Sequence, residues 1–142
     1  MKIAVGCDHG GFDLKNAIIE HLKKRGIEVN DLGCWSTDSV DYPEYGHKVA
    51  HAVADGEVDL GIVCCGTGMG ISIAANKVKG IRCALPFSDF TAQMCKQHNN
   101  ANMVAFGGRT LSPAEAIRYT DIWLDTEYEG GRHQKRLDMI EE

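Results

Sequence analysis

The chain of 142 residues has no long apolar run and no excess of basic residues. No stretch approaches the roughly 20 apolar residues that a membrane-spanning helix needs. The formal net charge of -5 disfavours nucleic acid or an anionic membrane as a partner. The start, MKIAVGCDHGG, lacks the long apolar region and the cleavage site of a signal peptide. We therefore predict a cytoplasmic protein that binds neither membranes nor nucleic acid.

The six cysteines do not have the spacing of a metal site. No Cys-x-x-Cys pair is present, so a cysteine-ligated zinc site is not expected. A chain of this length buries a substantial core and does not need disulfide cross-links. His47 and His51 share a helical face, but no third ligand accompanies them. The sequence therefore predicts reduced cysteines, no metal and no cofactor.

The glycines of CGTGMG, residues 65–70, do not match the common nucleotide-binding loops. The dinucleotide fingerprint needs a glycine or alanine at position 71, which is isoleucine, and a P-loop needs Gly-Lys-Ser/Thr. A phosphatase-type arginine six residues after Cys65 is also absent. Successive backbone N–H groups before a helix can still bind an anion, although a simple strand-to-helix turn explains the glycines equally well.

Short apolar segments alternate about five times along the chain with segments whose apolar residues recur at helical spacing. The strands are short and apolar, as in a parallel sheet that helices cover on both faces, which predicts an α/β fold in a single domain, residues 1–142. A last, largely exposed helix is expected from Arg132 onward. The expected strands are 2–7, 27–33, 58–64, 81–86 and 102–107, and the expected helices include 12–25, 44–55, 88–97 and 112–125.

Residues capable of chemistry follow three of these strands. They are Asp8 and His9, the loop that begins at Cys65, and Arg109. Ligands of open parallel sheets bind beyond the carboxyl ends of the strands, which is where these residues should lie. A helix N-terminus after the loop lowers the pKa of a thiol, so we interpret Cys65 as functional and Cys64, which should point to the opposite face, as structural.

Further polar residues lie later in the chain. A histidine side chain can act as an acid or a base near neutral pH, so His98 is a candidate for either role, whereas the asparagines after it also suit an ordinary loop. Arg132 and Arg136 are four residues apart and would share one helical face, where two cations attract phosphate or carboxylate. A solvated surface is the alternative explanation for both arginines.

Six ordered motifs resemble the type B ribose-5-phosphate isomerases, whose wider family includes galactose-6-phosphate isomerase subunits. The likeness runs from the first residues to the last helix, and the motifs are GCDHGG (6–11), DYPEYG (41–46), CGTGMGISIAANK (65–77), HNNAN (98–102), GGRT (107–110) and EGGRHQKR (129–136). The resemblance implies a Rossmann-like three-layer α/β/α sandwich with a five-stranded parallel sheet. It also implies a homodimer, or a tetramer built from dimers, with shared active sites.

The resemblance further implies metal-free interconversion of ribose 5-phosphate and ribulose 5-phosphate through an enediolate. Cys65 matches the catalytic base and His98 the acid that opens the sugar ring, with Asp8 and the hydroxyl of Thr67 as helpers. The matched substrate-binding positions are Asp8, His9, Gly66, Thr67, Gly68, Met69, Gly70, Asn99, Arg109, Arg132 and Arg136. In the family the C-terminal segment reaches a partner subunit's site, so Arg132 and Arg136 are expected to act across the dimer.

Three alternatives stay open from the sequence. The substrate could be a six-carbon sugar phosphate, such as allose or galactose 6-phosphate, because pocket shape sets the substrate length. A non-catalytic sugar-phosphate sensor would need the loop and the arginines but neither Cys65 nor His98. A cysteine-dependent hydrolase would need an orienting His–Asp arrangement, which Asp8 and His98 could imitate.

Overall fold

The computed structural model describes all 142 residues, and a five-stranded parallel sheet forms its centre. The strand order is β2-β1-β3-β5-β4, and every neighbouring pair is parallel. The bounds are β1 Lys2–Cys7, β2 Glu28–Asp31, β3 Leu60–Cys65, β4 Cys83–Ala84 and β5 Met103–Gly107. The sheet confirms the predicted α/β class, while β4 is much shorter than the expected 81–86.

The chain also forms six α-helices and one short 3-10 turn, and α1 to α5 cover the strands. Helix α5 begins at Pro113 within the expected range 112–125, and the hydroxyl of its N-cap Ser112 accepts a hydrogen bond from the backbone N–H of Glu115. Helix α2 begins at Tyr42, two residues before the expected start. The helices are α1 Phe12–Lys24, α2 Tyr42–Ala54, α3 Met69–Asn76, α4 Asp89–Gln97, α5 Pro113–Asp125 and α6 Arg132–Ile140.

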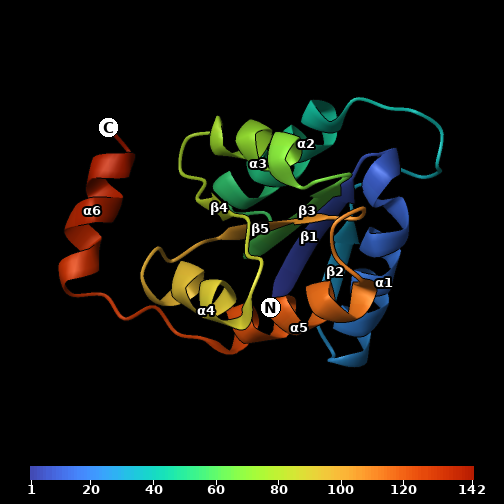
Figure 1. Cartoon of the computed structure of the whole chain (residues 1–142). Helices are drawn as coiled ribbons and strands as arrows, with labels where there is room; N and C mark the ends of the chain where they lie inside the picture. Colours follow the sequence, from blue (N-terminus) through green and yellow to red (C-terminus); the bar gives the residue numbers. More distant parts are fainter.

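Two hydrophobic cores lie on the two faces of the sheet. Helices α1, α4 and α5 cover one face, and α2 and α3 cover the other (Figure 1). Successive strand residues point to opposite faces, so Cys64 belongs to the first core and Cys65 to the second. This three-layer arrangement confirms the predicted sandwich and places Cys65 on the α2–α3 side.

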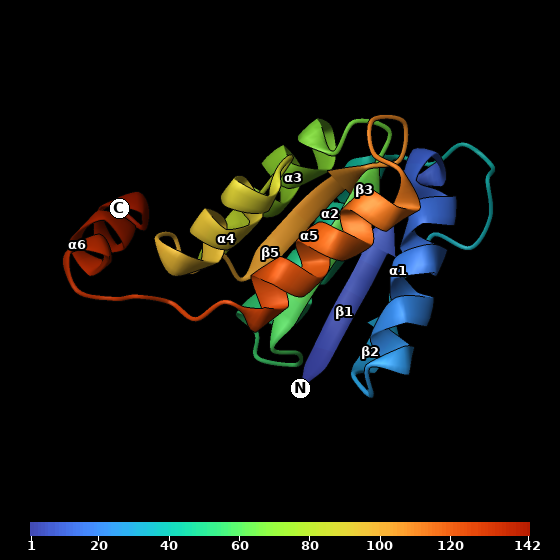
Figure 2. The ribbon, with the colours of Figure 1, turned by 60° about the horizontal axis from the view of Figure 1, so that its bottom comes forward.

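Helix α6 lies outside the two helical layers and contacts the rest of the chain at the amino end of the sheet, where His133 stacks on His98 and the C-cap Glu141 bonds Arg82. An extended segment after α5 leads to it, and the helix lies beyond the end of the sheet where β5 begins (Figure 2). Only His133 and Leu137 of this helix are buried, which agrees with the largely exposed helix that the sequence predicts. None of the helices is both long and apolar enough to cross a membrane.

Candidate active site

The chain reverses direction across the sheet between β1 and β3, and the first group of predicted residues gathers at this point. The chain leaves β1 toward β2 on one side, then returns through β3 toward β5 and β4 on the other. Such a switch point opens a crevice at the carboxyl ends of the strands. Cys7 pairs with Cys64 at that end, so Asp8 and the loop from Cys65 emerge side by side.

Cys65 closes β3 with its sulfur facing the glycine loop. Its Sγ accepts a hydrogen bond of 3.2 Å from the backbone N–H of Gly68. Gly68 is the N-cap of α3 and has φ of 80°, a left-handed conformation that favours glycine. A donor on the sulfur, at a helix N-terminus, stabilises the thiolate form.

The neighbouring thiol of Cys64 is in a different environment. Cys64 lies in the opposite core and is fully buried. Burial raises its pKa well above the ordinary value, so this thiol stays protonated. The structure therefore separates the two adjacent cysteines as the sequence predicts: Cys64 packs in the core, whereas Cys65 faces the loop.

Arg109 lies beside the glycine loop. The backbone N–H groups of Gly108 and Arg109 donate to the carbonyls of Cys65 and Gly66, at 2.8 and 2.9 Å. The Arg109 guanidinium covers Gly66 so closely that a Cβ on Gly66 would lie 2.9 Å from its Nη1. The exposed cation thus lies near the backbone donors of the loop.

Asp8 and His9 follow β1, and the next residue, Gly10, lies close to the backbone of Gly66 in the glycine loop. The buried Asp8 carboxylate accepts a hydrogen bond of 2.9 Å from the Gly10 N–H through Oδ1. The Nδ1 of His9 accepts a bond of 3.2 Å from the Val40 N–H, so the neutral ring carries its proton on Nε2. His9 therefore offers an Nε2–H donor to a ligand.

A buried lysine supports the segment that orients His9. Lys15 is 1% exposed, and its Nζ donates to Asp31 Oδ1 at 2.8 Å and to the Cys34 carbonyl at 2.9 Å. These bonds hold the start of the segment that continues to Val40. Because Lys15 is part of an ordinary amphipathic helix in the sequence, no local pattern distinguishes it from the surface lysines of the same helix.

The second group of predicted residues lies at the opposite end of the sheet. His98 caps the C-terminus of α4, and Asn99 follows it in the loop that leads to the amino end of β5. The neighbouring strands β3 and β5 pair through Gly61 and Met103 at their amino ends and through Cys65 and Gly107 at their carboxyl ends. Four residue steps at roughly 3.3 Å each separate the two pairs by about 13 Å.

Helix α6 belongs to this second group. The His98 ring stacks on the ring of His133, with centroids 4.2 Å apart and an interplanar angle of 19°. Arg132 and Arg136 stand on the same helix as His133 and are exposed. Within one chain, the structure therefore does not bring His98, Asn99, Arg132 or Arg136 to Cys65.

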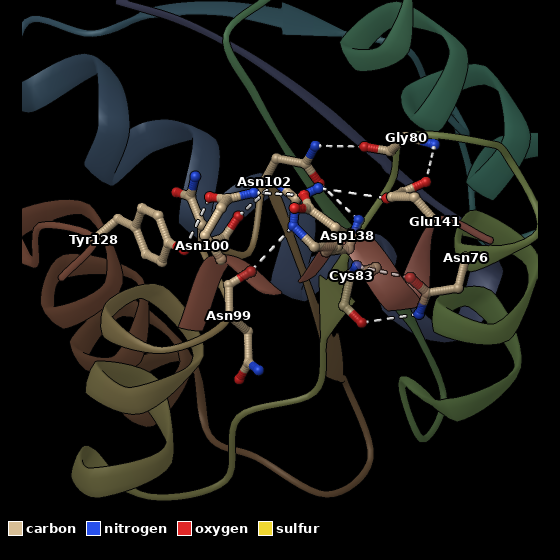
Figure 3. A network of polar contacts seen from close by, with 11 residues as sticks. Asn76, Gly80, Cys83, Asn99, Asn100, Asn102, Tyr128, Asp138 and Glu141 are labelled. Carbon is tan, nitrogen blue, oxygen red and sulfur yellow. Dashed lines mark hydrogen bonds and ion pairs between the residues drawn. The ribbon is translucent and has the colours of Figure 1, made fainter. Parts of the chain in front are cut away.

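A polar network fixes the loop that carries Asn99 (Figure 3). Arg82 donates from Nε to the Asn99 carbonyl at 3.0 Å and from Nη2 to the Asn100 carbonyl at 3.1 Å. The Asn102 side chain bonds the Arg82 N–H at 2.8 Å and the Gly80 carbonyl at 2.9 Å. Arg82 is not among the predicted site residues, because nothing local in the sequence shows that it faces this loop.

Comparison with known proteins agrees with this fold and these motifs. The family model described as Ribose/Galactose Isomerase matches residues 3–140. Ribose-5-phosphate isomerase B of Escherichia coli is 54% identical over 139 residues, which cover 98% of this chain and 93% of that protein.

Solved structures resemble the whole chain. Ribose-5-phosphate isomerase B of Clostridium thermocellum has a TM-score of 0.98 at 52% identity and covers 99% of this chain and 95% of its own. The Mycoplasma genitalium enzyme with bound ribulose 5-phosphate has a TM-score of 0.93 at 43% identity and covers 99% and 93%. The chain therefore belongs to the ribose/galactose isomerase family.

Proposed function

We propose that this protein interconverts ribose 5-phosphate and ribulose 5-phosphate, with Cys65 as the base. The observation that carries the proposal is the Cys65 sulfur at the sheet's switch point, bonded by the Gly68 N–H at the start of α3. The Mycoplasma genitalium relative, which holds ribulose 5-phosphate, supports the choice of substrate. Cys64 cannot replace Cys65, because it faces the other core.

The chemistry is a proton transfer between neighbouring carbons of the open sugar. The Cys65 thiolate removes the proton from C2 of the aldose, and the electron pair forms an enediolate. The thiol then returns the proton to C1 while the hydroxyl proton of O2 passes to O1, which yields the ketose and regenerates the thiolate. Negative charge develops on the sugar oxygens, near the backbone N–H groups of 66–70 and the Thr67 hydroxyl, and one such donor typically lowers the barrier by ~3 kcal/mol.

Hydrogen-bond donors around the crevice position the substrate. The Arg109 guanidinium beside Gly66 and the Nε2–H of His9 provide donors for a phosphate. Gly66, Gly68, Met69 and Gly70 complete the proposed substrate-binding positions. Binding of the phosphate holds the first two carbons near the sulfur, so the entropy cost of bringing the reacting groups together is met on binding and not in the chemical step.

A second copy of the chain supplies the rest of the site. His98 and Asn99 lie at the wrong end of the sheet to act with Cys65 of the same chain, and α6 lies beyond that same end (Figure 2). We infer that these residues, with Arg132 and Arg136, enter the crevice of the partner in a homodimer, or in a tetramer built from dimers. His98 would then protonate the ring oxygen as the sugar opens, with Asp8 assisting.

Exposed apolar side chains near the β4 edge support this dimer. Phe87 and Phe90, which follow β4, are 73% and 69% exposed, and Ile73 of α3 is 61% exposed. Met139 and Ile140 on α6 are also exposed. An apolar set on both the sandwich and the outlying helix is typical of a surface that another subunit covers.

A coupled assay with ribose 5-phosphate, allose 6-phosphate and galactose 6-phosphate side by side tests the substrate. We expect the five-carbon sugar to have the highest kcat/KM; a six-carbon sugar that reacts faster would contradict the assignment. The variant Cys65→Ala should lose turnover while binding of the sugar phosphate persists. Its matched control is Cys64→Ala, on the same strand but the opposite face, which should keep activity.

A further inference from the structure

Three side chains able to bind a metal ion converge where α6 meets the end of α4. They are His98, Glu129 and His133, and one ligand atom of each lies within 4.8 Å of those of the other two. The Nε2 of His133 is 3.7 Å from the Glu129 carboxylate. Two imidazoles with one carboxylate form a donor set that suits zinc.

An unsatisfied atom marks this cluster independently. The Nε2 of His133 is the one buried side-chain nitrogen or oxygen that has no hydrogen-bond partner, and His133 is only 6% exposed. This nitrogen therefore has no protein hydrogen bond to lose when an ion binds it.

We propose that His98, Glu129 and His133 form a binding site for a divalent zinc-like ion, and that the bound ion inhibits the enzyme. His133 Nε2 and the Glu129 carboxylate supply the first two ligands. The His98 and His133 rings stack, so their lone pairs lie in nearly parallel planes. His98 completes the site by turning about its Cβ–Cγ bond, a torsion with broad preferences in histidine.

The surroundings of the cluster set how tightly an ion binds. Arg132 Nη1 lies 3.2 Å from the same Glu129 oxygen, and Gln97 donates to the other oxygen at 2.8 Å. The ion has to displace Arg132, but an exposed ion pair of this kind contributes little to stability. The positive charges of Arg132 and Arg136 oppose the ion, so moderate affinity and reversible binding are expected.

The inhibitory effect rests on the proposed function. If His98 donates a proton to the ring oxygen of the sugar, an ion on its ring nitrogen takes the place of the proton that this step needs. The ion would also draw His98 toward Glu129 and away from the partner's crevice. Cys65 lies in another part of the chain, so its own proton transfer would continue.

Binding is tested with Co²⁺ and Zn²⁺ on the metal-free full-length protein, independently of activity. His47 and His51, whose ring centroids are 6.5 Å apart on α2, could hold an ion themselves, so all variants carry His47→Gln and His51→Gln. We expect one Co²⁺ per chain with a visible absorption band of nitrogen and oxygen ligands. Glu129→Gln and His133→Asn should each weaken Co²⁺ binding by at least about tenfold. Mutation of a residue that only hydrogen-bonds a metal ligand already lowers metal affinity by about that factor.

The matched control is Glu127→Gln, an exposed glutamate two residues before the proposed ligand, which should bind the ion like the parent. No binding, or equal binding in Glu129→Gln, would overturn the site. Because Glu129 is exposed, the Glu129→Gln variant is expected to fold, and it still tests the site if replacement of the buried His133 prevents folding.

Zn²⁺ should slow isomerisation of ribose 5-phosphate by the parent but much less by Glu129→Gln, with equal rates for both in chelator. Equal inhibition of both proteins would mean that the ion acts elsewhere, for instance on the Cys65 thiolate, and would overturn the inhibitory role. A metal-free parent that does not isomerise ribose 5-phosphate would overturn the proposed function instead, since the Co²⁺ measurement does not depend on turnover.

Discussion

The two halves of the proposed site lie at opposite ends of one chain's sheet, and this predicts that two inactive variants restore each other. Cys65→Ala removes the base and His98→Asn removes the acid. In either homodimer, both sites lack one of the two groups. In a mixed dimer, one site lacks both groups, but the other combines Cys65 of one copy with His98 of its partner.

The size of the recovery follows from symmetry. When equal amounts of the two variants pair at random, half of the dimers are mixed, and each mixed dimer has one intact site of its two. The mixture should therefore regain about one quarter of wild-type activity per chain, and the purified mixed dimer about one half. A site built within one chain would regain nothing, because no chain then carries both groups.

The assay mixes two differently tagged variants by joint refolding or coexpression and purifies the mixed dimer through both tags. The isomerase rate is then measured with ribose 5-phosphate. The control pairs Cys65→Ala with Asp8→Asn, since both residues lie in the same crevice and every site of that mixed dimer lacks one of them. Confirmed mixed dimers of Cys65→Ala and His98→Asn that show no more activity than this control would refute the shared site.

Three further outcomes are expected. His98→Asn should lose isomerisation of ribose 5-phosphate but should still exchange the C1 proton of ribulose 5-phosphate with D₂O, because this open-chain sugar needs no ring opening. NMR follows the exchange, and loss of both reactions would contradict the ring-opening role. Gly68→Ala should lower the free energy of unfolding in urea by about 1–3 kcal/mol, because its Cβ would lie 2.6 Å from Leu85 in a left-handed backbone. Gly80→Ala, with φ of 88° and no atom within 4 Å, isolates the backbone strain and should cost less. Burial lowers the pKa of His133 below 6.5, so as the pH falls the unfolded chain protonates this histidine before the folded chain does. The melting temperature should therefore fall as the pH drops below 6.5, and it should fall less in His133→Asn.

Much of the fold could be predicted from the sequence because it depends on local patterns. The alternation of apolar runs with helical spacing identified a parallel sheet between helices, and the helix expected over 112–125 is α5. The two-residue period of a strand was enough to assign Cys64 and Cys65 to opposite faces of the sheet. The bounds of 81–86 were wrong, since β4 is an edge strand that pairs only through Cys83 and Ala84.

The sequence by itself determined which residue types carry the chemistry and that Cys65 opens a glycine loop. The predicted alternation even contained a signal for His98, because a residue between a helix and the next strand lies at the amino end of a parallel sheet. Only the tertiary structure decided that His98, Arg132 and Arg136 lie beyond reach of the thiol of their own chain. It also decided that Lys15, Arg82 and His133 face the segments around the site. The physical reason is that propensity and period act over a few residues, whereas strand order and helix docking join residues that the chain places far apart.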